Sequence, residues 1–496
     1  MMTRRQFCST TIAAGLAAAY PGLTAFGRQL AVATRSDTSI PAISLGGREI
    51  ELGKAAVNEL VDSLAGEVLL SGHPQFDDMR ALWNGMHDKR PALIARCREV
   101  EDVSKAVTFA RENDLLLAVR GGGHSWPGKS VCDGGLMLDL SLMNKVRVDP
   151  AARRAHAAGG ALLYGLDRAA RRHGLITTAG VVSHTGVGGF TLGGGFGRLN
   201  RKFGLTIDNL KSAQIVTADG RIRRISAEQD PDLFWGIRGG GGNFGVVTEF
   251  EYQLHPFPLQ PYLGVVVWPI EQAGEVLDFY ADWHGGLSDE LYVGPNLLTT
   301  PDGTSLLAVE VVYVGDPNDG EREAAPLFRI GKPLDNTVGL NDYLDFQTQN
   351  DAAMHYGIRS YAKSAMVKDI SPEMVRAMRE AFVADPRVGL FTHTAGGAVK
   401  RIGELDTAFP HRNAETMLVF AGFWTDPAHD QEVIAAVREY YASLEPFAGG
   451  YYDNIDFERS RETGNYGPAY ARLARVKAKY DPGNLFRLNS NIRPAT

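Results

Sequence analysis

The sequence has few cysteines, no excess of basic residues and no long apolar run, and each absence excludes a class of protein. Three cysteines in 496 residues exclude a scaffold held together by many disulfides. If Cys8 is removed with a signal peptide, Cys97 and Cys132 remain, and their spacing does not show whether they pair. A formal charge of −7 offers no basic surface for nucleic acid, so we expect no nucleic-acid partner.

Two common catalytic patterns are also absent. No histidines have H-E-x-x-H spacing, which argues against a zinc hydrolase, and we predict no metal site. No serine lies in a G-x-S-x-G elbow, so a serine hydrolase of the usual type is not expected. The composition, with 44% hydrophobic and 22% charged residues, is that of a globular protein long enough for two or three domains.

The amino terminus has the pattern of an export signal. The twin arginine Arg4-Arg5 is followed by the apolar stretch 11–20, which is too short to span a bilayer, and then by small residues. We therefore predict a signal peptide over residues 1–33 and twin-arginine export to the periplasm or the medium, with no stable membrane anchor. The alternative is a chance arginine pair before a weakly amphipathic helix.

A glycine turn with a histidine at its tip is the most informative local feature. Gly121, Gly122 and Gly123 follow a strand-like stretch, 115–119, and lead into His124. Glycines tolerate positive φ angles and let the backbone approach a ligand closely, and successive N–H groups in such a turn suit a phosphate. The histidine would then face the rest of a bound cofactor. The alternative is a tight surface turn with an incidental histidine.

Two further glycine-rich segments, 178–197 and 235–245, follow the first. Three glycines ending at Gly245 satisfy the dinucleotide-binding spacing G-x-G-x-x-G. That mechanism needs a helix after the glycines, so that its N-terminus faces the pyrophosphate. Here residues 246–254 have the composition of a strand, so we reject the match.

The chain divides at a proline-rich stretch, 255–261. Before it, strands and helices alternate from about residue 91, and Ser371-Pro372 marks a helix start in the region that follows. We predict strands at 91–96, 115–119, 137–140, 212–217, 246–254, 262–267, 305–314, 388–394 and 417–423, and helices at 101–113, 162–173, 270–283, 372–383 and 430–444.

The three glycine segments, in this order, resemble those of the FAD-linked oxidases of the p-cresol methylhydroxylase/vanillyl-alcohol oxidase superfamily, in particular the berberine bridge enzyme-like group. The similarity covers nearly the whole chain after about residue 75. At the carboxyl end, Tyr452 and Asn454 match the family's Y-x-N strand, and residues 465–486 resemble its closing helix and turn.

This resemblance implies an α+β fold. A two-part FAD-binding domain of the p-cresol methylhydroxylase type would be formed by residues 75–255 and 450–496. A substrate domain over residues 256–449 would contain a sheet covered by helices. The resemblance also implies that Cys97 and Cys132 are buried and unpaired.

The resemblance further implies FAD as a covalently bound cofactor. His124 matches the histidine that bonds to the flavin in that family. Many members attach the flavin to a cysteine as well, but Val182 stands at that position, so we expect a covalent link through His124 only. The cofactor contacts that the resemblance implies are His124, Arg120, Gly121, Gly122, Gly123, Ser125, Gly180, Val182, Ser183, Thr185, Gly186, Gly188, Gly189, Gly194, Gly245, Val247 and Asn454.

Tyr452 is the catalytic residue that we predict. Loss of a hydride from an alcohol or amine is easier when a base removes the proton on the heteroatom, and a tyrosine with a pKa near 10 needs a nearby cation or hydrogen-bond donor for that role. The alternative is a packed aromatic ring with a satisfied hydroxyl. Weaker candidates for the site are His184, His355, Tyr356, His393 and Trp424.

The expected function is oxidation of a small alcohol, sugar, amine or aromatic substrate by hydride transfer to covalently bound FAD, with molecular oxygen as the acceptor. One alternative is a dehydrogenase that passes electrons to a quinone or a protein. Another is a non-catalytic flavin- or carbohydrate-binding protein on the same fold. Glycine segments common to the whole family do not identify the substrate.

Overall fold

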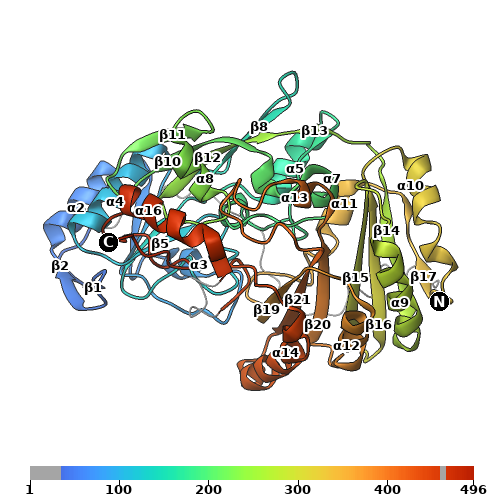
Figure 1. Ribbon diagram of the computed structural model, residues 1–496. Helices are drawn as coiled ribbons and strands as arrows, with labels where there is room; N and C mark the ends of the chain where they lie inside the picture. Colours follow the sequence, from blue (N-terminus) through green and yellow to red (C-terminus); the bar gives the residue numbers. More distant parts are fainter. Residues whose placement is uncertain (1–34, 458–464) are drawn as a thin grey trace.

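The computed structural model describes residues 35–457 and 465–496, so the predicted signal peptide lies outside the described residues. Figure 1 shows two lobes side by side. The first lobe contains residues 35–257 together with the C-terminal residues 465–496, and the second lobe contains residues 262–449. Helices and sheets occur in both, which confirms the α+β class.

The first lobe is built on two sheets. In the smaller one, β4 and β5 both pair in parallel with β6, and β3 adds an antiparallel edge; in the larger one, the strand order is β11-β10-β12-β8-β7. The strands of the first lobe are β1 (Ile40–Ile43), β2 (Glu49–Leu52), β3 (Glu67–Leu70), β4 (Leu93–Arg96), β5 (Leu117–Arg120), β6 (Leu136–Asp139), β7 (Val146–Asp149), β8 (Arg154–Ala158), β9 (Leu175–Ile176), β10 (Leu210–Val216), β11 (Ile222–Ser226), β12 (Val246–Gln253) and β13 (His255–Pro256).

Helices cover both sheets of this lobe. α4 forms where its sequence places Val103, Ala106, Val107 and Ala110 on one face, and all four are fully buried, as predicted. The helices of the first lobe are α2 (Lys54–Ser63), α3 (Phe76–Arg80), α4 (Val100–Glu112), α5 (Leu163–Arg171), α6 (Val187–Leu192), α7 (Asn200–Phe203), α8 (Pro231–Ile237) and α16 (Tyr470–Tyr480).

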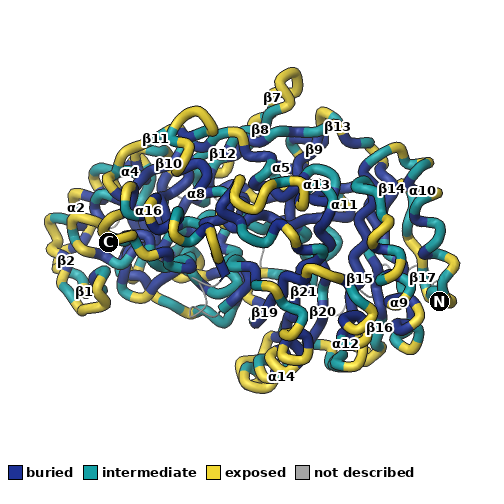
Figure 2. Tube along the Cα trace, viewed as in Figure 1, coloured by how far each residue is buried: buried dark blue, intermediate teal, exposed yellow. Residues whose placement is uncertain are grey.

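The second lobe is one large antiparallel sheet with helices on one face, which confirms the predicted architecture. Its order is β17-β14-β16-β15-β20-β21-β19, with β18 beside β14. α9, α12 and α14 pack on the outer face of this sheet, whose strands are the buried layer in Figure 2. These elements are β14 (Tyr262–Pro269), α9 (Ala273–His284), β15 (Leu291–Thr299), β16 (Ser305–Tyr313), α10 (Pro317–Ala324), β17 (Asp335–Asn336), β18 (Gly339–Leu340), α11 (Tyr343–Thr348), β19 (Arg359–Val367), α12 (Pro372–Glu380), β20 (Val388–Thr394), α13 (Gly397–Arg401), β21 (Thr416–Trp424) and α14 (Asp430–Leu444).

Alternation along β20 separates the two faces of this sheet. Val388 and Leu390 belong to the core that the sheet forms with its helices. Because successive side chains of a strand point to opposite faces, Phe391 and His393 face the first lobe instead. Phe391 accordingly packs in a different cluster, which contains Tyr452 from the C-terminal part of the chain.

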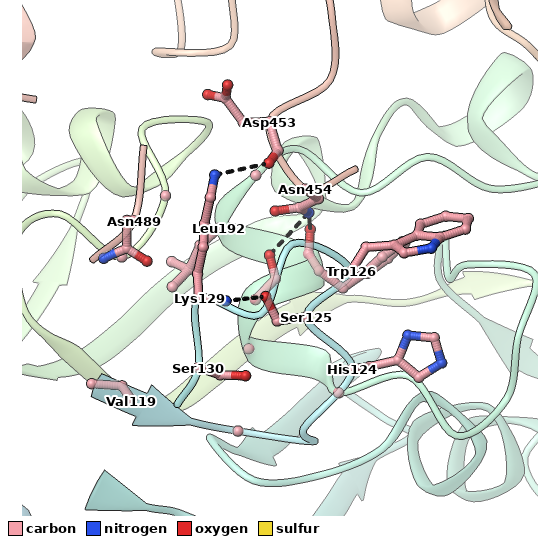
Figure 3. Close-up of a pocket in the computed structure, with 18 of the residues that line it drawn as sticks. Val119, His124, Ser125, Trp126, Lys129, Ser130, Leu192, Asp453, Asn454 and Asn489 are labelled. Atoms are coloured by element: carbon pink, nitrogen blue, oxygen red, sulfur yellow. Dashed lines mark hydrogen bonds between the residues drawn. The ribbon is translucent and has the colours of Figure 1, made fainter. Parts of the chain in front are cut away.

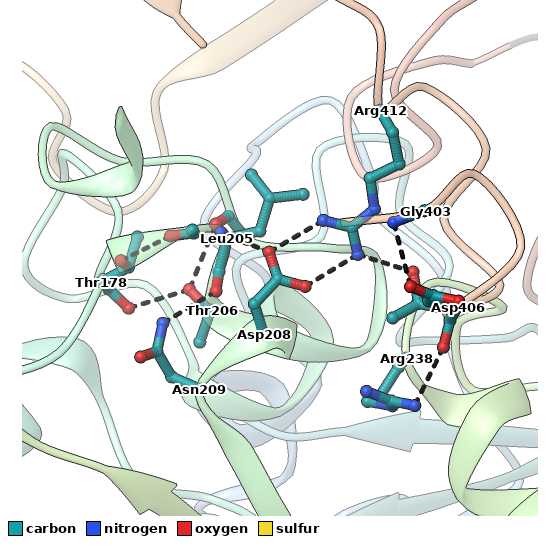
Figure 4. A network of polar contacts seen from close by, with 12 residues as sticks. Thr178, Leu205, Thr206, Asp208, Asn209, Arg238, Gly403, Asp406 and Arg412 are labelled. Atoms are coloured by element: carbon teal, nitrogen blue, oxygen red, sulfur yellow. Dashed lines mark hydrogen bonds and ion pairs between the residues drawn. The ribbon is translucent and has the colours of Figure 1, made fainter. Parts of the chain in front are cut away.

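The long connection between β20 and β21, residues 395–415, leaves the second lobe and contacts the first. Arg412 donates to both carboxylate oxygens of Asp208 at 2.8 Å, and the two side chains are 1% and 6% exposed (Figure 4). Phe409 lies against the backbone of Gly194 and Gly239. Removing one partner of a buried ion pair destabilises a protein by several kcal/mol, because the other charge is left buried without a counter-ion. The Arg412–Asp208 pair therefore fixes the two lobes together.

Several features differ from the sequence-based expectations. β3 pairs with β4, so the first lobe extends to the N-terminal side of the predicted start at residue 75. Tyr452 and Asn454 lie in a turn and not in a strand, because the carbonyl of Tyr452 accepts a hydrogen bond from the amide of Ile455 at 3.0 Å. We identify no sequence signal for β15, where Gly294 and Pro295 interrupt the strand composition.

Among the described helices, none combines the length and the apolar composition needed to cross a membrane. Within residues 35–457 and 465–496, no group of three or more His, Cys, Asp or Glu side chains is arranged to hold a metal ion. Cys97 and Cys132 are buried and form no disulfide.

Candidate active site

A cavity lies where the three glycine segments meet the C-terminal part of the chain (Figure 3). The turn after β5 forms one wall, the loop that leads into α6 forms a second, and the residues before β12 form a third. Asn489 and Ser490 close it on the C-terminal side, while His393 and Met417 reach it from the second lobe. Segments distant in sequence therefore build one site.

The first two glycine segments touch backbone to backbone. A Cβ added at Gly122 would lie 2.4 Å from the Cα of Gly186, and a Cβ added at Gly186 would lie 2.4 Å from the amide nitrogen of Gly122. Real side chains do not approach this closely, so each position requires glycine. The contact fixes the His124 turn against the loop that precedes α6.

His124 lies between aromatic rings. Its imidazole stacks on Trp83 with ring centroids 4.3 Å apart and planes inclined by 13°, and His184 lies on its other side at 5.0 Å. Burial, assisted by His184, lowers the pKa of His124 to about 3. The Nε2 atom is buried and has no hydrogen-bond partner among the residues that the structure describes. The ring is therefore neutral near pH 7 and retains a nitrogen lone pair, as a nucleophile requires.

The second segment contributes exposed backbone to the cavity. Val182, Thr185, Gly188 and Gly189 line it, and a Cβ added at Gly189 would meet no atom within 4 Å. The cavity wall therefore carries no side chain at Gly189, which leaves room for a ligand. No thiol is present at Val182, and neither cysteine of the described chain lines the cavity.

The third segment is tied to the second through the end of α6. The carbonyl of Leu192 accepts hydrogen bonds from the amides of Gly239 at 3.1 Å and Gly241 at 3.0 Å. β12 begins directly after Gly245, whose φ is +156°. The absence of a helix at this point confirms that the G-x-G-x-x-G spacing is not a Rossmann fingerprint.

Lys477 of α16 anchors the C-terminal part of the chain beside the third segment. Its fully buried ammonium donates to the carbonyls of Asn243 at 2.6 Å and Phe486 at 2.9 Å and to Asp481 at 2.6 Å. Burial lowers the pKa of Lys477 to about 8, although Asp481 opposes the shift. This cluster positions the chain that runs on to Ser490.

Tyr452 reaches the cavity from its turn and is 4% exposed. Its hydroxyl oxygen accepts hydrogen bonds from the amide of Gly195 at 3.0 Å and from Nδ2 of Asn454 at 2.9 Å. Burial raises the pKa of Tyr452 to about 12, and these two donors act in the opposite direction. The hydrogen-bond donors that a tyrosine base needs are thus present. The hydroxyl hydrogen of Tyr452 remains available for a further acceptor.

Most of the residues expected at the cofactor line the cavity, and three do not. Arg120 pairs with the buried Asp139 at 3.0 Å, beneath the turn that it precedes. Ser183 donates to Asp351 at 2.5 Å, and Gly194 packs against Phe409. The predicted residues that line the cavity are Gly121, Gly122, Gly123, His124, Ser125, Gly180, Val182, Thr185, Gly186, Gly188, Gly189, Gly245, Val247, Tyr452 and Asn454.

Among the weaker candidates, some lie at the cavity and others do not. His393 lines the cavity. His184 lies behind His124 and contacts Tyr356, whose hydroxyl donates to the carbonyl of Gly122 at 2.6 Å. The Nδ1 atom of His355 lies 3.0 Å from the backbone carbonyl of Tyr356, and the indole N–H of Trp424 donates to Asp430 of α14. Neither side chain lines the cavity.

The polar residues of the cavity that escaped prediction include Lys129, Ser130, Asn243, Asp453, Asn489 and Ser490. Lys129 donates to the hydroxyl of Ser490 at 2.8 Å. Its ammonium also approaches the carbonyl of Asp453 (Figure 3). The polar run that follows the closing turn was the available signal for Asn489 and Ser490. Lys129 lies only five residues after His124, and nothing in the sequence separates it from an ordinary surface lysine.

The cavity fits a long ligand that has a flat ring and a charged linker. It is lined by backbone on several sides and has a cation at Lys129. It also contains the buried hydroxyl of Ser130 and Nε2 of His124, neither of which has a hydrogen-bond partner within the described part of the chain. Residues 91–226 match the family model described as an FAD binding domain. The protein is therefore a flavin-dependent oxidoreductase.

Comparison with known proteins identifies the family to which this protein belongs. Residues 451–493 match the model described as berberine and berberine like. An FAD-linked oxidoreductase of Dictyostelium discoideum is 31% identical, over 88% of this chain and 97% of that protein. Chitooligosaccharide oxidase of Gibberella zeae is 30% identical, over 82% and 87%. The crystal structure of 6-hydroxy-D-nicotine oxidase from Arthrobacter nicotinovorans has a TM-score of 0.79 at 31% identity, covering 87% of this chain and 99% of that one.

The chain thus belongs to the berberine bridge enzyme-like group of FAD-linked oxidases, within the p-cresol methylhydroxylase/vanillyl-alcohol oxidase superfamily. This finding confirms the resemblance in the glycine segments and at the carboxyl end.

The contact between the first two glycine segments can be tested with Gly122→Ala. The added methyl group has no space, so we expect a loss of about 1–3 kcal/mol in the free energy of unfolding and a lower flavin content. Gly165→Ala is the matched control, because its Cβ would come no closer than 3.8 Å to Val146 and helix α5 would gain up to about 1 kcal/mol. Thermal unfolding and the flavin-to-protein absorbance ratio measure both effects. A Gly122→Ala protein with normal stability and flavin content would contradict the described contact.

Proposed function

We propose that this FAD-linked oxidoreductase oxidises a small alcohol, sugar, amine or aromatic substrate, that a single covalent bond at His124 holds its flavin, and that molecular oxygen accepts the electrons. The observation that carries the proposal is a neutral imidazole, whose Nε2 has no hydrogen-bond partner among the described residues, at a cavity lined by glycine backbone. The flavin, when bound, supplies a hydride acceptor, which no side chain can provide.

The proposed bond at His124 is supported by the state of its ring. A protonated imidazole has no free lone pair, and burial keeps this one unprotonated at any pH above about 4, because the pKa of His124 is lowered to about 3. A second bond has no support, because Val182 occupies the position of the family's cysteine and both described cysteines lie elsewhere.

Tyr452 is proposed as the group that takes the proton from the substrate heteroatom. Tyr452 accepts this proton only as the phenolate, so its own hydroxyl proton must first pass to solvent, and the hydrogen bonds from Gly195 and Asn454 would stabilise that phenolate. Phe196 packs edge-on against the Tyr452 ring at 5.4 Å and holds it in place.

Oxygen as the acceptor is supported by the relatives, which include proteins named as a nicotine oxidase and a chitooligosaccharide oxidase. Oxygen uptake that accompanies substrate turnover would support the oxidase proposal. Turnover with a quinone or a redox protein, without oxygen uptake, would instead identify a dehydrogenase.

The covalent bond can be tested with His124→Ala. We expect wild-type protein that has been denatured in acid and washed to stay yellow and fluorescent, and the variant to lose all of its flavin, because no other residue forms a bond. His173→Ala, at an exposed histidine beyond α5, is the control and should keep its flavin. Flavin retained by the His124 variant would reveal a second attachment, and wild-type protein that never binds flavin would refute the function.

Replacing Tyr452 with phenylalanine removes the proposed proton acceptor but keeps the packed ring. With any substrate that the wild type oxidises, we expect kcat to fall about 10²- to 10³-fold while flavin content is unchanged. Tyr440→Phe is the matched control, since that buried hydroxyl donates to the carbonyl of Met378 on the outer face of the second lobe. An unchanged kcat in Tyr452→Phe would exclude this tyrosine as the base.

We also propose export by the twin-arginine route, on the strength of Arg4-Arg5 and the short apolar stretch behind it. In a bacterium with this route, we expect cell fractionation to find the wild type outside the cytoplasm and the Arg4→Lys, Arg5→Lys double variant inside it. Arg35→Lys is the control. Equal export of the double variant would rule out the route.

A further inference from the structure

The wall of the cavity that faces Tyr452 from the second lobe is mostly apolar. β20 and β21 pair so that His393 stands opposite Met417, and both line the cavity. Phe391 and Phe423 pack in the same cluster, as does Trp126 from the first lobe. Flat aromatic rings and a flexible thioether are surfaces that accept another flat apolar group.

His393 is the polar exception in this wall. Its Nδ1 is enclosed by protein and has no hydrogen-bond partner among the described residues. Burial lowers the pKa of His393 to about 4, so the ring is neutral near pH 7. A buried N–H without a partner is costlier than an unpaired lone pair, so the proton belongs on Nε2. The Nε2 atom also has no hydrogen bond to a described residue, so its N–H is available to a ligand in the cavity.

The charged groups near this wall already have partners. Glu310, whose field reaches His393, receives two hydrogen bonds from the fully buried Arg198, at 2.9 and 2.7 Å. The charged residues that line the cavity are Lys129 and Asp453, and the Lys129 ammonium is directed at Ser490 and the Asp453 carbonyl. A charged substrate beside His393 would therefore lose its hydration without gaining a counter-ion, which costs several kcal/mol.

We propose that the substrate is an electrically neutral molecule with a flat apolar ring and a single oxygen or nitrogen acceptor, and that His393 recognises this acceptor. The inference rests on the proposed function and names the substrate class of the same site. His393 would orient the ring between Met417, Trp126 and Tyr452, so that the hydrogen bond selects one end of the substrate. An oligosaccharide has many hydroxyl groups and would need more polar partners than this wall provides.

The test is a binding experiment on purified holoenzyme, followed through the change in flavin absorbance on addition of a small probe. Phenol and toluene have the same flat ring, but only phenol has an acceptor. We expect the wild type to prefer phenol, and His393→Phe to reduce the phenol-to-toluene affinity ratio about 3- to 10-fold. His393→Gln, which keeps a donor, should preserve most of this ratio, and His173→Gln is the surface control.

Charge and polarity are tested with the same proteins. Benzoate, which is negatively charged, and cellobiose, which is a neutral sugar, should each bind the wild type at least tenfold more weakly than phenol. Two results obtained with flavin-containing protein would overturn the proposal. One is an unchanged phenol-to-toluene affinity ratio in His393→Phe, and the other is tighter binding of benzoate or cellobiose than of phenol. Wild-type protein without flavin would instead refute the proposed function, and this inference with it.

Discussion

The close approach of Gly122 and Gly186 is the constraint on which the rest of the site depends. Without side chains at these positions, the His124 turn rests directly on the loop before α6. That loop is in turn held by the amides of Leu163 and Tyr164, which donate to the carbonyls of Thr185 and Ser183 at 2.9 and 2.8 Å. The end of α6 then holds the third glycine segment. A chain of backbone contacts thus fixes the position of His124 relative to every other wall of the cavity.

Burial is the common physical cause of the site's electrostatics. It lowers the pKa of His124 and of His393 and raises that of Tyr452, so in each case burial favours the uncharged form of the side chain. Hydrogen bonds, and not ion pairs, therefore decide how these groups act. The charges of Arg198 and Glu310, whose fields reach His393, neutralise each other.

The parts of the site that the sequence predicted are those defined by residues in short segments. The glycine turn with His124, the helix start at Ser371 and the strand after Gly245 all have local causes, and the structure contains them. The stacking of Trp83 on His124 joins residues that are far apart in the chain, and no local pattern encodes it. The strand expected at Tyr452 was wrong because a hydrogen bond within the segment closes a turn, which composition does not reveal.

The position of Asn489 and Ser490 in the cavity wall has a consequence for the order of events during biosynthesis. These residues are synthesised after the three glycine-rich segments, and they are held in place through Asn243, whose side chain donates to the carbonyl of Ser490 at 2.9 Å. A nascent chain with all three glycine-rich segments already folded still lacks this wall. The cavity is therefore complete only once residues 489 and 490 have been synthesised, and a ribosome that stalls before them leaves a product in which this wall is missing.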